Sequence, residues 1–188
     1  MDSDDISRPD RCEKEMRFLT QHSDISVVGG FVEEFTTEEV IDFKPNNVRT
    51  IRVVPETPED VIRFAKRRST FNHPTVMYRK KDVLAAGNYQ DIRFSQDYYL
   101  WIHMLIAGFK GYNLQEPLVY MRADTQMFKR RSGKLCREIQ LNLFKFMREQ
   151  KFISNYQYIE ACVLRIGLSI IPSSILSFIF HRFLRKES

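Results

Sequence analysis

The order of apolar and polar residues divides the first two thirds of the chain into short strands and helices. Runs rich in β-branched and aromatic residues predict four strands, at 25–35, 50–55, 73–80 and 117–122. Apolar residues at helical spacing predict helices at 10–21, from 58 onward, at 80–87 and at 97–107. The first strand, ISVVGGFVEEF, is interrupted by Gly29 and Gly30, a pair that indicates a bulge or the close approach of a ligand.

Local signals mark the ends of these helices. Thr57 is placed to cap a helix that has Pro58 at its first position, and Asp60 completes a capping box. Gly87 and Gly108 follow the next two helical segments and predict their ends. Strands and helices therefore alternate over this part of the chain, which indicates an α/β fold.

The pattern changes near Arg131. Residues 132–150 and 155–171 are predicted to be helical, with no strand between them. We therefore divide the chain into an α/β part, 1–131, and a C-terminal helical region, 132–188.

The apolar segment 163–186 allows three interpretations. It contains Arg165 and Pro172 and ends in His181, Arg182, Arg185 and Lys186. A spanning helix needs about 20 mostly uncharged residues, which this run does not provide unless Arg165 lies at the edge. An in-plane segment at a membrane surface fits better, and packing against the domain core is the remaining alternative.

Composition narrows the class of protein. The chain has 188 residues, 43% hydrophobic and 28% charged, as expected for one globular domain with an appendage. Its net charge of +5 suits an anionic partner such as a nucleotide, a nucleic acid or an acidic membrane surface. The three cysteines are far apart and form no CxxC pair, which argues against a zinc site or a disulfide framework. A reducing compartment is the simplest interpretation.

Near the N-terminus, the stretch DSDD places Asp2, Asp4 and Asp5 close together. Carboxylates on a tight turn suit a hard divalent cation such as Mg²⁺ or Mn²⁺. Acidic clusters also occur as solvated residues at helix N-termini, where the helix dipole favours them. The motif alone does not decide between these interpretations.

Asp97 begins a predicted helix directly after a short loop. A carboxylate there, beside aromatic residues, could accept a proton from a hydroxyl group. Aspartate is also among the best helix N-caps, and without further context the cap is the more frequent role.

Other candidates are basic or aromatic. Arg122, Lys129, Arg130 and Arg131 follow a predicted strand and could hold a diphosphate, although a solvated loop is the default interpretation of such a charge run. His73 could contact a substrate or be a buried structural histidine. Aromatic faces suit sugars, but at helical spacing core packing is the safer assignment for Trp101; the Tyr98–Tyr99 pair is a further candidate of the same kind.

The order of these motifs resembles the family 2 glycosyltransferases of the GT-A fold. The similarity is to bacterial members that build exopolysaccharide, capsule and O-antigen units. It is carried, over residues 1–131, by MDSDDISRPDRCEKE, VVGGFVEEF, FNHPTVMYRK, AAGNYQD, QDYYLWIHML and EPLVYMR. The resemblance implies a Rossmann-like α/β domain with a mixed sheet, of which this chain is the C-terminal portion, followed by a helical extension.

The resemblance implies roles for residues on the donor side. Asp2 and Asp4 form the DxD element that holds Mn²⁺ or Mg²⁺, with Asp4 the more direct ligand, and Asp5 would lie near the donor sugar. The nucleotide-sugar donor would be bound by Asp2 and Asp5. Its diphosphate would also meet basic side chains, namely Arg122, Lys129 and Arg131.

On the acceptor side, the resemblance makes Asp97 the general base. Family members often have Glu-Asp at this point, whereas this chain has Gln96-Asp97, so the role rests on Asp97 alone. The remaining acceptor-binding residues implied by the match are Gly29, Gly30, His73, Gln96 and Trp101. The reaction would be a single displacement with inversion.

The implied partners are a nucleotide-sugar donor and a saccharide or lipid-linked saccharide acceptor. The protein would be cytoplasmic and peripheral on the inner face of the bacterial plasma membrane. No nucleic-acid partner is expected, because no motif supports one. The family's nucleotide-binding half has no counterpart here, so we expect part of a longer enzyme, a second chain that supplies that half, or an inactive fragment that binds only a membrane or a partner.

Overall fold

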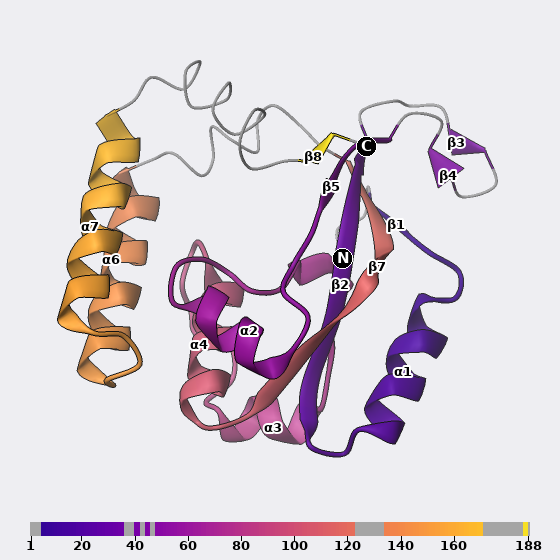
Figure 1. Ribbon diagram of the computed structural model, residues 1–188, viewed down its shortest axis with the longest axis horizontal. Coiled ribbons are helices and arrows are strands. Elements are labelled where there is room, and N and C mark those ends of the chain that lie inside the picture. The colour runs from indigo at the N-terminus through magenta and orange to yellow at the C-terminus, as the bar shows by residue number, and fades with distance from the viewer. Residues whose placement is uncertain are drawn as a thin grey trace.

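The computed structural model describes residues 5–35, 40–41, 44–45, 48–122, 134–170 and 186–187 (Figure 1). Its centre is a six-stranded sheet in the order β1-β7-β2-β5-β8, with β6 also paired to β2. The strands are β1 (Ile6–Ser7), β2 (Ile25–Phe35), β5 (Val48–Arg52), β6 (Met77–Tyr78), β7 (Lys110–Arg122) and β8 (Lys186–Glu187). Two further strands, β3 (Val40–Ile41) and β4 (Lys44–Pro45), pair with each other.

The sheet is mixed, as predicted. The two long strands β2 and β7 run parallel at its centre, and the other pairings within it are antiparallel. Helices cover both faces (Figure 1). The helix α1 (Arg11–Gln21) lies on one side. The opposite side carries α2 (Pro58–Ala65), α3 (Lys80–Ala85) and α4 (Gln96–Ile106).

A helical hairpin, formed by α6 (Lys134–Glu149) and α7 (Asn155–Ile170), packs beyond α4. Its buried residues Leu143, Phe144 and Met147 belong to the same core cluster as Trp101 of α4. The rings of His103 and Phe146 stack with their centroids 4.6 Å apart. The predicted α/β arrangement with C-terminal helices is therefore confirmed.

The glycine pair in β2 lies where the sheet is irregular. The register between β2 and β7 shifts after Gly30, so the bulge predicted from the sequence is confirmed. A Cβ on Gly30 would lie 2.6 Å from Cδ1 of the buried Leu118, and one on Gly29 would lie 2.8 Å from Oδ1 of Asn113. Only glycine permits this approach between β7 and β2.

The predicted N-cap of α2 is confirmed, and Asp60 bonds the hydroxyl of Thr57 where a full capping box would have it bond the Thr57 amide. The Asp60 amide donates to Oγ1 of Thr57 at 3.3 Å, and the Thr57 hydroxyl donates to the Asp60 carboxylate at 2.9 Å. Pro58 is the first helical residue, as its missing amide hydrogen favours.

The segment 73–80 differs from its prediction as a strand. Residues His73–Thr75 form the 3₁₀ turn η1, and only Met77 and Tyr78 pair with β2 before α3 begins at Lys80. Pro74 cannot donate a ladder hydrogen bond, and the Thr75 hydroxyl donates instead to the Asn72 carbonyl at 2.8 Å. The strand prediction was wrong here because local side-chain bonds stabilise a turn.

Strand β7 is longer than predicted and begins at Lys110 instead of 117. Its first half is polar and lacks the alternation of a strand, but it pairs with the start of β2 from Ile25 onward. Pairing with β2, and not the local sequence, therefore makes this segment a strand.

The C-terminal apolar segment is described only in part. Helix α7 covers it as far as Ile170, whereas 171–185 and the division near Arg131 lie outside the described residues. None of the helices in the described part of the chain combines the length and apolar character that a membrane crossing requires.

Candidate active site

The acidic N-terminal segment enters the sheet beside the end of β7. Oδ1 of Asp5 accepts a hydrogen bond from the backbone amide of Arg122 at 3.1 Å. The guanidinium of Arg122 lies 4.8 Å from the ring centroid of Phe35. Two of the residues predicted on the donor side, Asp5 and Arg122, are thus brought together from opposite ends of the α/β part.

The entry point is fixed by further contacts. Ile6 pairs with Tyr120, and the amide of Arg8 donates to the Leu118 carbonyl at 3.0 Å. The Arg8 guanidinium bonds the Glu33 carboxylate at 2.7 Å and lies 4.9 Å from the Tyr120 ring centroid. The segment that follows the DSDD motif is therefore held against β7.

The other predicted donor-side residues, Asp2, Asp4, Lys129 and Arg131, lie outside the described residues. Within the described ranges, no group of three or more histidine, cysteine or acidic residues is arranged to hold a metal ion. The DxD site therefore stays a prediction from the sequence.

Asp97 lies in the first turn of α4 and is half-buried. The N-cap is Ser95, in the left-handed region at φ 59°, and no side chain caps this helix. The interpretation of Asp97 as an N-cap is therefore wrong. Within the described part of the chain, its carboxylate makes no hydrogen bond or ion pair.

An aromatic residue, Tyr89, lies near this carboxylate. Burial, together with the neighbouring Tyr78 and Asp97, raises the pKa of Tyr89 to about 12. The rings of Tyr89 and His73 meet edge to face, with centroids 6.4 Å apart. His73 itself is exposed, so it is not the buried structural histidine that the sequence allowed. Gln96, next to Asp97, is also exposed.

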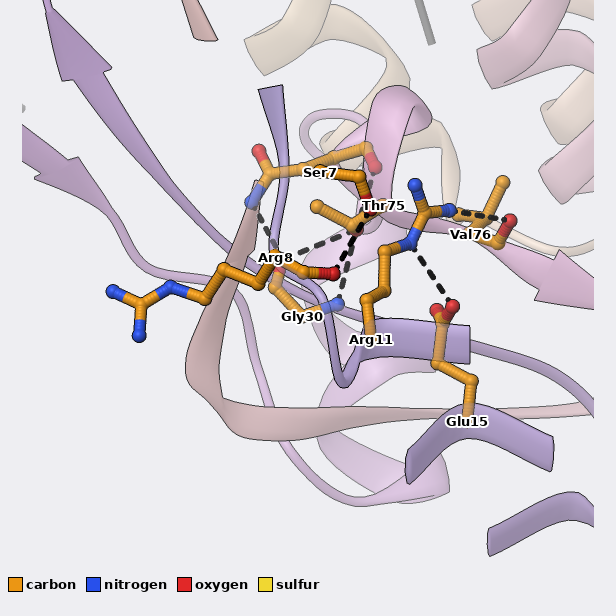
Figure 2. Close-up of polar contacts among 8 residues, drawn as sticks. Ser7, Arg8, Arg11, Glu15, Gly30, Thr75 and Val76 are labelled. Atoms are coloured by element: carbon orange, nitrogen blue, oxygen red, sulfur yellow. Dashed lines mark hydrogen bonds and ion pairs between the residues drawn. The ribbon is translucent and has the colours of Figure 1, made fainter. Parts of the chain in front are cut away.

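The glycine pair supports the turn that carries His73 (Figure 2). The amide of Gly30 donates to Oγ1 of Thr75 at 3.0 Å, and Nδ2 of Asn72 donates to the Gly30 carbonyl at 2.9 Å. Gly29 and Gly30 are both buried, so the described structure places them beneath the turn and not on its surface. Asn72 and Thr75 were missed by sequence reasoning, although Pro74 between two short polar residues is a turn signal.

Trp101 lies behind His73. Its ring is 0% exposed, with its centroid 5.3 Å from that of Phe71 and 6.4 Å from that of His73. The hydroxyl of Tyr98 donates to the Ala65 carbonyl at 2.6 Å, and that of Tyr99 to the Ile139 carbonyl at 2.9 Å. All three aromatic residues are therefore used in packing, the alternative that the sequence favoured for Trp101.

A buried carboxylate ties α1 to the same turn (Figure 2). Glu15 is 0% exposed, and its Oε2 accepts a hydrogen bond from Nε of Arg11 at 3.0 Å. Nη2 of Arg11 also donates to the Val76 carbonyl at 3.3 Å. Burial raises the pKa of Glu15 to about 7, against the opposing effect of Arg11.

This pKa predicts how stability changes with pH. The folded protein holds the Glu15 proton up to about pH 7, whereas the unfolded chain releases it near 4.5. The free energy of unfolding should therefore fall as pH rises through this window, by roughly 3 kcal/mol at about 1.4 kcal/mol per pKa unit. Urea denaturation of Glu15→Gln should lose this slope, and Glu13→Gln, an exposed neighbour on α1, should keep it. If the free energy of unfolding changed with pH equally in the wild type and in Glu15→Gln, the raised pKa of Glu15 would be contradicted.

No family model matches the chain, but known proteins do. It is 35% identical over 186 residues to an uncharacterized glycosyltransferase of Haemophilus influenzae, covering 99% of this chain and 67% of that protein. It is 31% identical over 185 residues to the UDP-Gal:alpha-D-GlcNAc-diphosphoundecaprenol beta-1,3-galactosyltransferase of Escherichia coli, covering 98% of this chain and 65% of that protein. A third relative, the amylovoran biosynthesis glycosyltransferase AmsE of Erwinia amylovora, is 28% identical over 185 residues, with 97% and 65% covered.

These relatives match almost the whole length of the chain, including the mixed sheet and the helix that begins beside Asp97. The chain belongs to the glycosyltransferases. It spans about two thirds of the length of the relatives it matches. The resemblance stated from the motifs is confirmed at this level, and the assignment to family 2 stays a prediction.

Proposed function

We propose that the protein transfers a sugar from a nucleoside-diphosphate sugar to a hydroxyl group of a saccharide acceptor in bacterial surface polysaccharide synthesis. The observation that carries this proposal is the half-buried Asp97 carboxylate at the start of α4, for which the described residues show no hydrogen bond or ion pair. Tyr89 lies near it, and the ring of Tyr89 meets that of the exposed His73. The finer assignment, to the inverting family 2 enzymes of the GT-A fold, rests on the order of the motifs in the sequence.

The names of two relatives support the substrate classes. The Escherichia coli protein is named for a UDP-galactose donor and a diphosphoundecaprenol-linked acceptor, and the Erwinia amylovora protein for amylovoran biosynthesis. By analogy, the acceptor of this chain is a lipid-linked saccharide. The protein would then work in the cytoplasm, on the inner face of the membrane.

Different residues serve the acceptor end and the donor end of the proposed site. Asp97 accepts the proton of the acceptor hydroxyl as its oxygen attacks the anomeric carbon. The exposed Gln96, next to Asp97, and the exposed His73, whose ring meets that of Tyr89, contact the acceptor. The buried Gly30 and Trp101 position His73 from beneath.

At the donor end, Asp5 and Arg122 form one unit at the end of β7. The cationic Arg122, with Lys129 and Arg131 further along the chain, binds the diphosphate. Side chains of this charge stabilise the negative charge that develops on the leaving group.

Asp2 and Asp4 are the proposed ligands of Mg²⁺ or Mn²⁺. Carboxylate oxygens suit either ion, so the chemistry of this donor set fits. A bound ion would supply positive charge toward the departing nucleoside diphosphate.

The test is release of nucleoside diphosphate from a panel of nucleotide sugars, with a lipid-linked saccharide as acceptor. We expect Asp4→Asn to raise the Mn²⁺ concentration needed for half-maximal transfer by roughly tenfold or more, because a ligand is lost. Asp10→Asn, an exposed carboxylate outside the motif, is the control. An unchanged metal response in Asp4→Asn would place the ion elsewhere. Absence of transfer with every donor would favour the alternative of a membrane- or partner-binding module.

A further inference from the structure

Helix α7 carries a concentration of exposed apolar side chains. Ten large apolar residues are exposed in the described part of the chain, and half of them lie on this one helix: Tyr156, Ile159, Val163, Leu164 and Ile166. The other five are spread over α1, β6, α3, α6 and the segment after β5. Single exposed apolar residues are ordinary, whereas a gathered set indicates an interaction surface.

Three of these residues form one face. Tyr156, Ile159 and Val163 are spaced i, i+3 and i+7, which places them in a line along a helix. Their exposed fractions are 77%, 60% and 64%. The opposite side of α7 packs on the core through the buried Ala161. We call Tyr156, Ile159 and Val163 the apolar face of α7, a helix that lies at one edge of the molecule (Figure 1).

Cations flank this face. Four cations lie at the end of α2 and directly after it, here called the α2 cation group: Arg63, Lys66, Arg67 and Arg68. Arg63 pairs with Asp60 of the same helix at 3.1 Å. Arg67 pairs with Glu160 of α7 at 3.6 Å, and Nη2 of Arg165 donates to the Arg67 carbonyl at 3.3 Å. Glu160 follows Tyr156 by one helical turn, so the cation group adjoins the apolar face.

We infer that the apolar face of α7 and the α2 cation group bind an anionic lipid surface. Apolar side chains of an in-plane helix enter the boundary between headgroups and acyl chains, and neighbouring cations bind the anionic headgroups. The sequence from 171 to 186 continues in the same manner, with apolar residues followed by Arg182, Arg185 and Lys186 and no acidic residue. This inference rests on the proposed function, in which the acceptor is lipid-linked.

Contacts between α4 and α6 connect the helical hairpin that carries this surface to the helix that carries Asp97. The hydroxyl of Tyr99, two residues after Asp97, donates to the Ile139 carbonyl of α6 at 2.9 Å. The stacked His103 and Phe146 join the same two helices further along. A lipid surface bound by α7 would therefore stand in a fixed relation to Asp97.

A second copy of the chain fits this surface less well. Pairing of two identical patches about a twofold axis would bring two α2 cation groups toward each other. Like charges placed across an interface oppose association. Anionic headgroups remove this repulsion, and charge complementarity therefore favours lipid as the occupant.

The experiment is vesicle flotation without donor or acceptor. Vesicles containing phosphatidylglycerol are compared with pure phosphatidylcholine vesicles. We expect Ile159→Ser/Val163→Ser to weaken binding to the anionic vesicles by tenfold or more. Arg63→Gln/Arg67→Gln should weaken it by about tenfold and reduce its sensitivity to salt. The matched control is Met16→Ser/Leu84→Ser, which removes two apolar residues of 58% and 53% exposure from other helices.

Circular dichroism establishes that each variant is folded. Binding unchanged by the α7 pair, or no binding of the wild type, would overturn the inference. So would a dimer in sedimentation that the α7 pair dissociates, because a second copy would then cover this face. A protein that transfers sugar to a soluble acceptor but ignores vesicles refutes this inference alone. One that binds vesicles but transfers no sugar refutes the proposed function alone.

Discussion

Asp97→Asn is expected to slow sugar transfer by roughly 10²–10⁴-fold, the usual contribution of a general base. The amide keeps the size of the carboxylate but cannot accept the proton of the acceptor hydroxyl. No described residue binds the Asp97 side chain and it does not cap α4, so the change should leave the fold intact. The measurement is the turnover rate in the protein purified from its own cells.

Two comparisons make this result specific. Binding of the nucleotide-sugar donor, measured by calorimetry, should survive in Asp97→Asn, because the donor-side residues Asp5 and Arg122 lie elsewhere. Asp91→Asn changes an exposed carboxylate in the loop before α4 and should leave turnover unchanged. Full turnover in Asp97→Asn would remove this residue from the mechanism.

Trp101→Ala is expected to lower the free energy of unfolding by about 3–5 kcal/mol, the range for removing a large buried aromatic ring. The ring is 0% exposed and packs against Phe71, His73 and Tyr78, so its loss leaves a cavity in the largest core cluster. Urea denaturation followed by circular dichroism measures the change.

Trp101→Phe separates packing from a direct role in binding. Within the described residues the buried Nε1 of Trp101 has no hydrogen-bond partner, so replacing the indole with a phenyl ring removes no hydrogen bond seen there. This variant should keep most of the stability and the acceptor KM. Tyr156→Ala, at a ring that is 77% exposed, controls for the loss of an aromatic residue without a cavity. A raised KM in a stable Trp101→Phe protein would assign Trp101 to the acceptor.

The sequence predicted well those elements whose boundaries are set by residues within the element itself. Bonds between Thr57 and Asp60, with Pro58 at the first helical position, define the start of α2. Gly30 marks the bulge because no side chain fits there. The turn at 73–75 was read as a strand because the local Thr75–Asn72 bond that stabilises it leaves no apolar pattern, and the further partners of Asn72, Gly30 and Arg52, come from distant strands. Apolar content alone does not show such contacts.

The sequence predicted which residues belong to the candidate site better than it predicted how they are arranged. The motifs named Asp5 and Arg122, but only the parallel pairing of β2 and β7 and the antiparallel pairing of β1 bring them together. The glycines were placed on the acceptor side, and the structure shows that they lie beneath the turn that holds His73. Tyr89 was missed because nothing in its local sequence relates it to Asp97.

The parallel pairing of β2 with β7 also governs how the chain folds. Val27 pairs with Gly111 and Phe35 with Arg122, so the centre of the sheet joins segments separated by α2, α3 and α4. Contacts of such long range carry a large loop-closure entropy and form slowly. During synthesis, β5 and β6 can pair with β2 early, but the edge of β2 that binds β7 stays open until β7 has left the ribosome. The interval between those two events is when the chain is most exposed to aggregation, and a chaperone that shields β2 would act then.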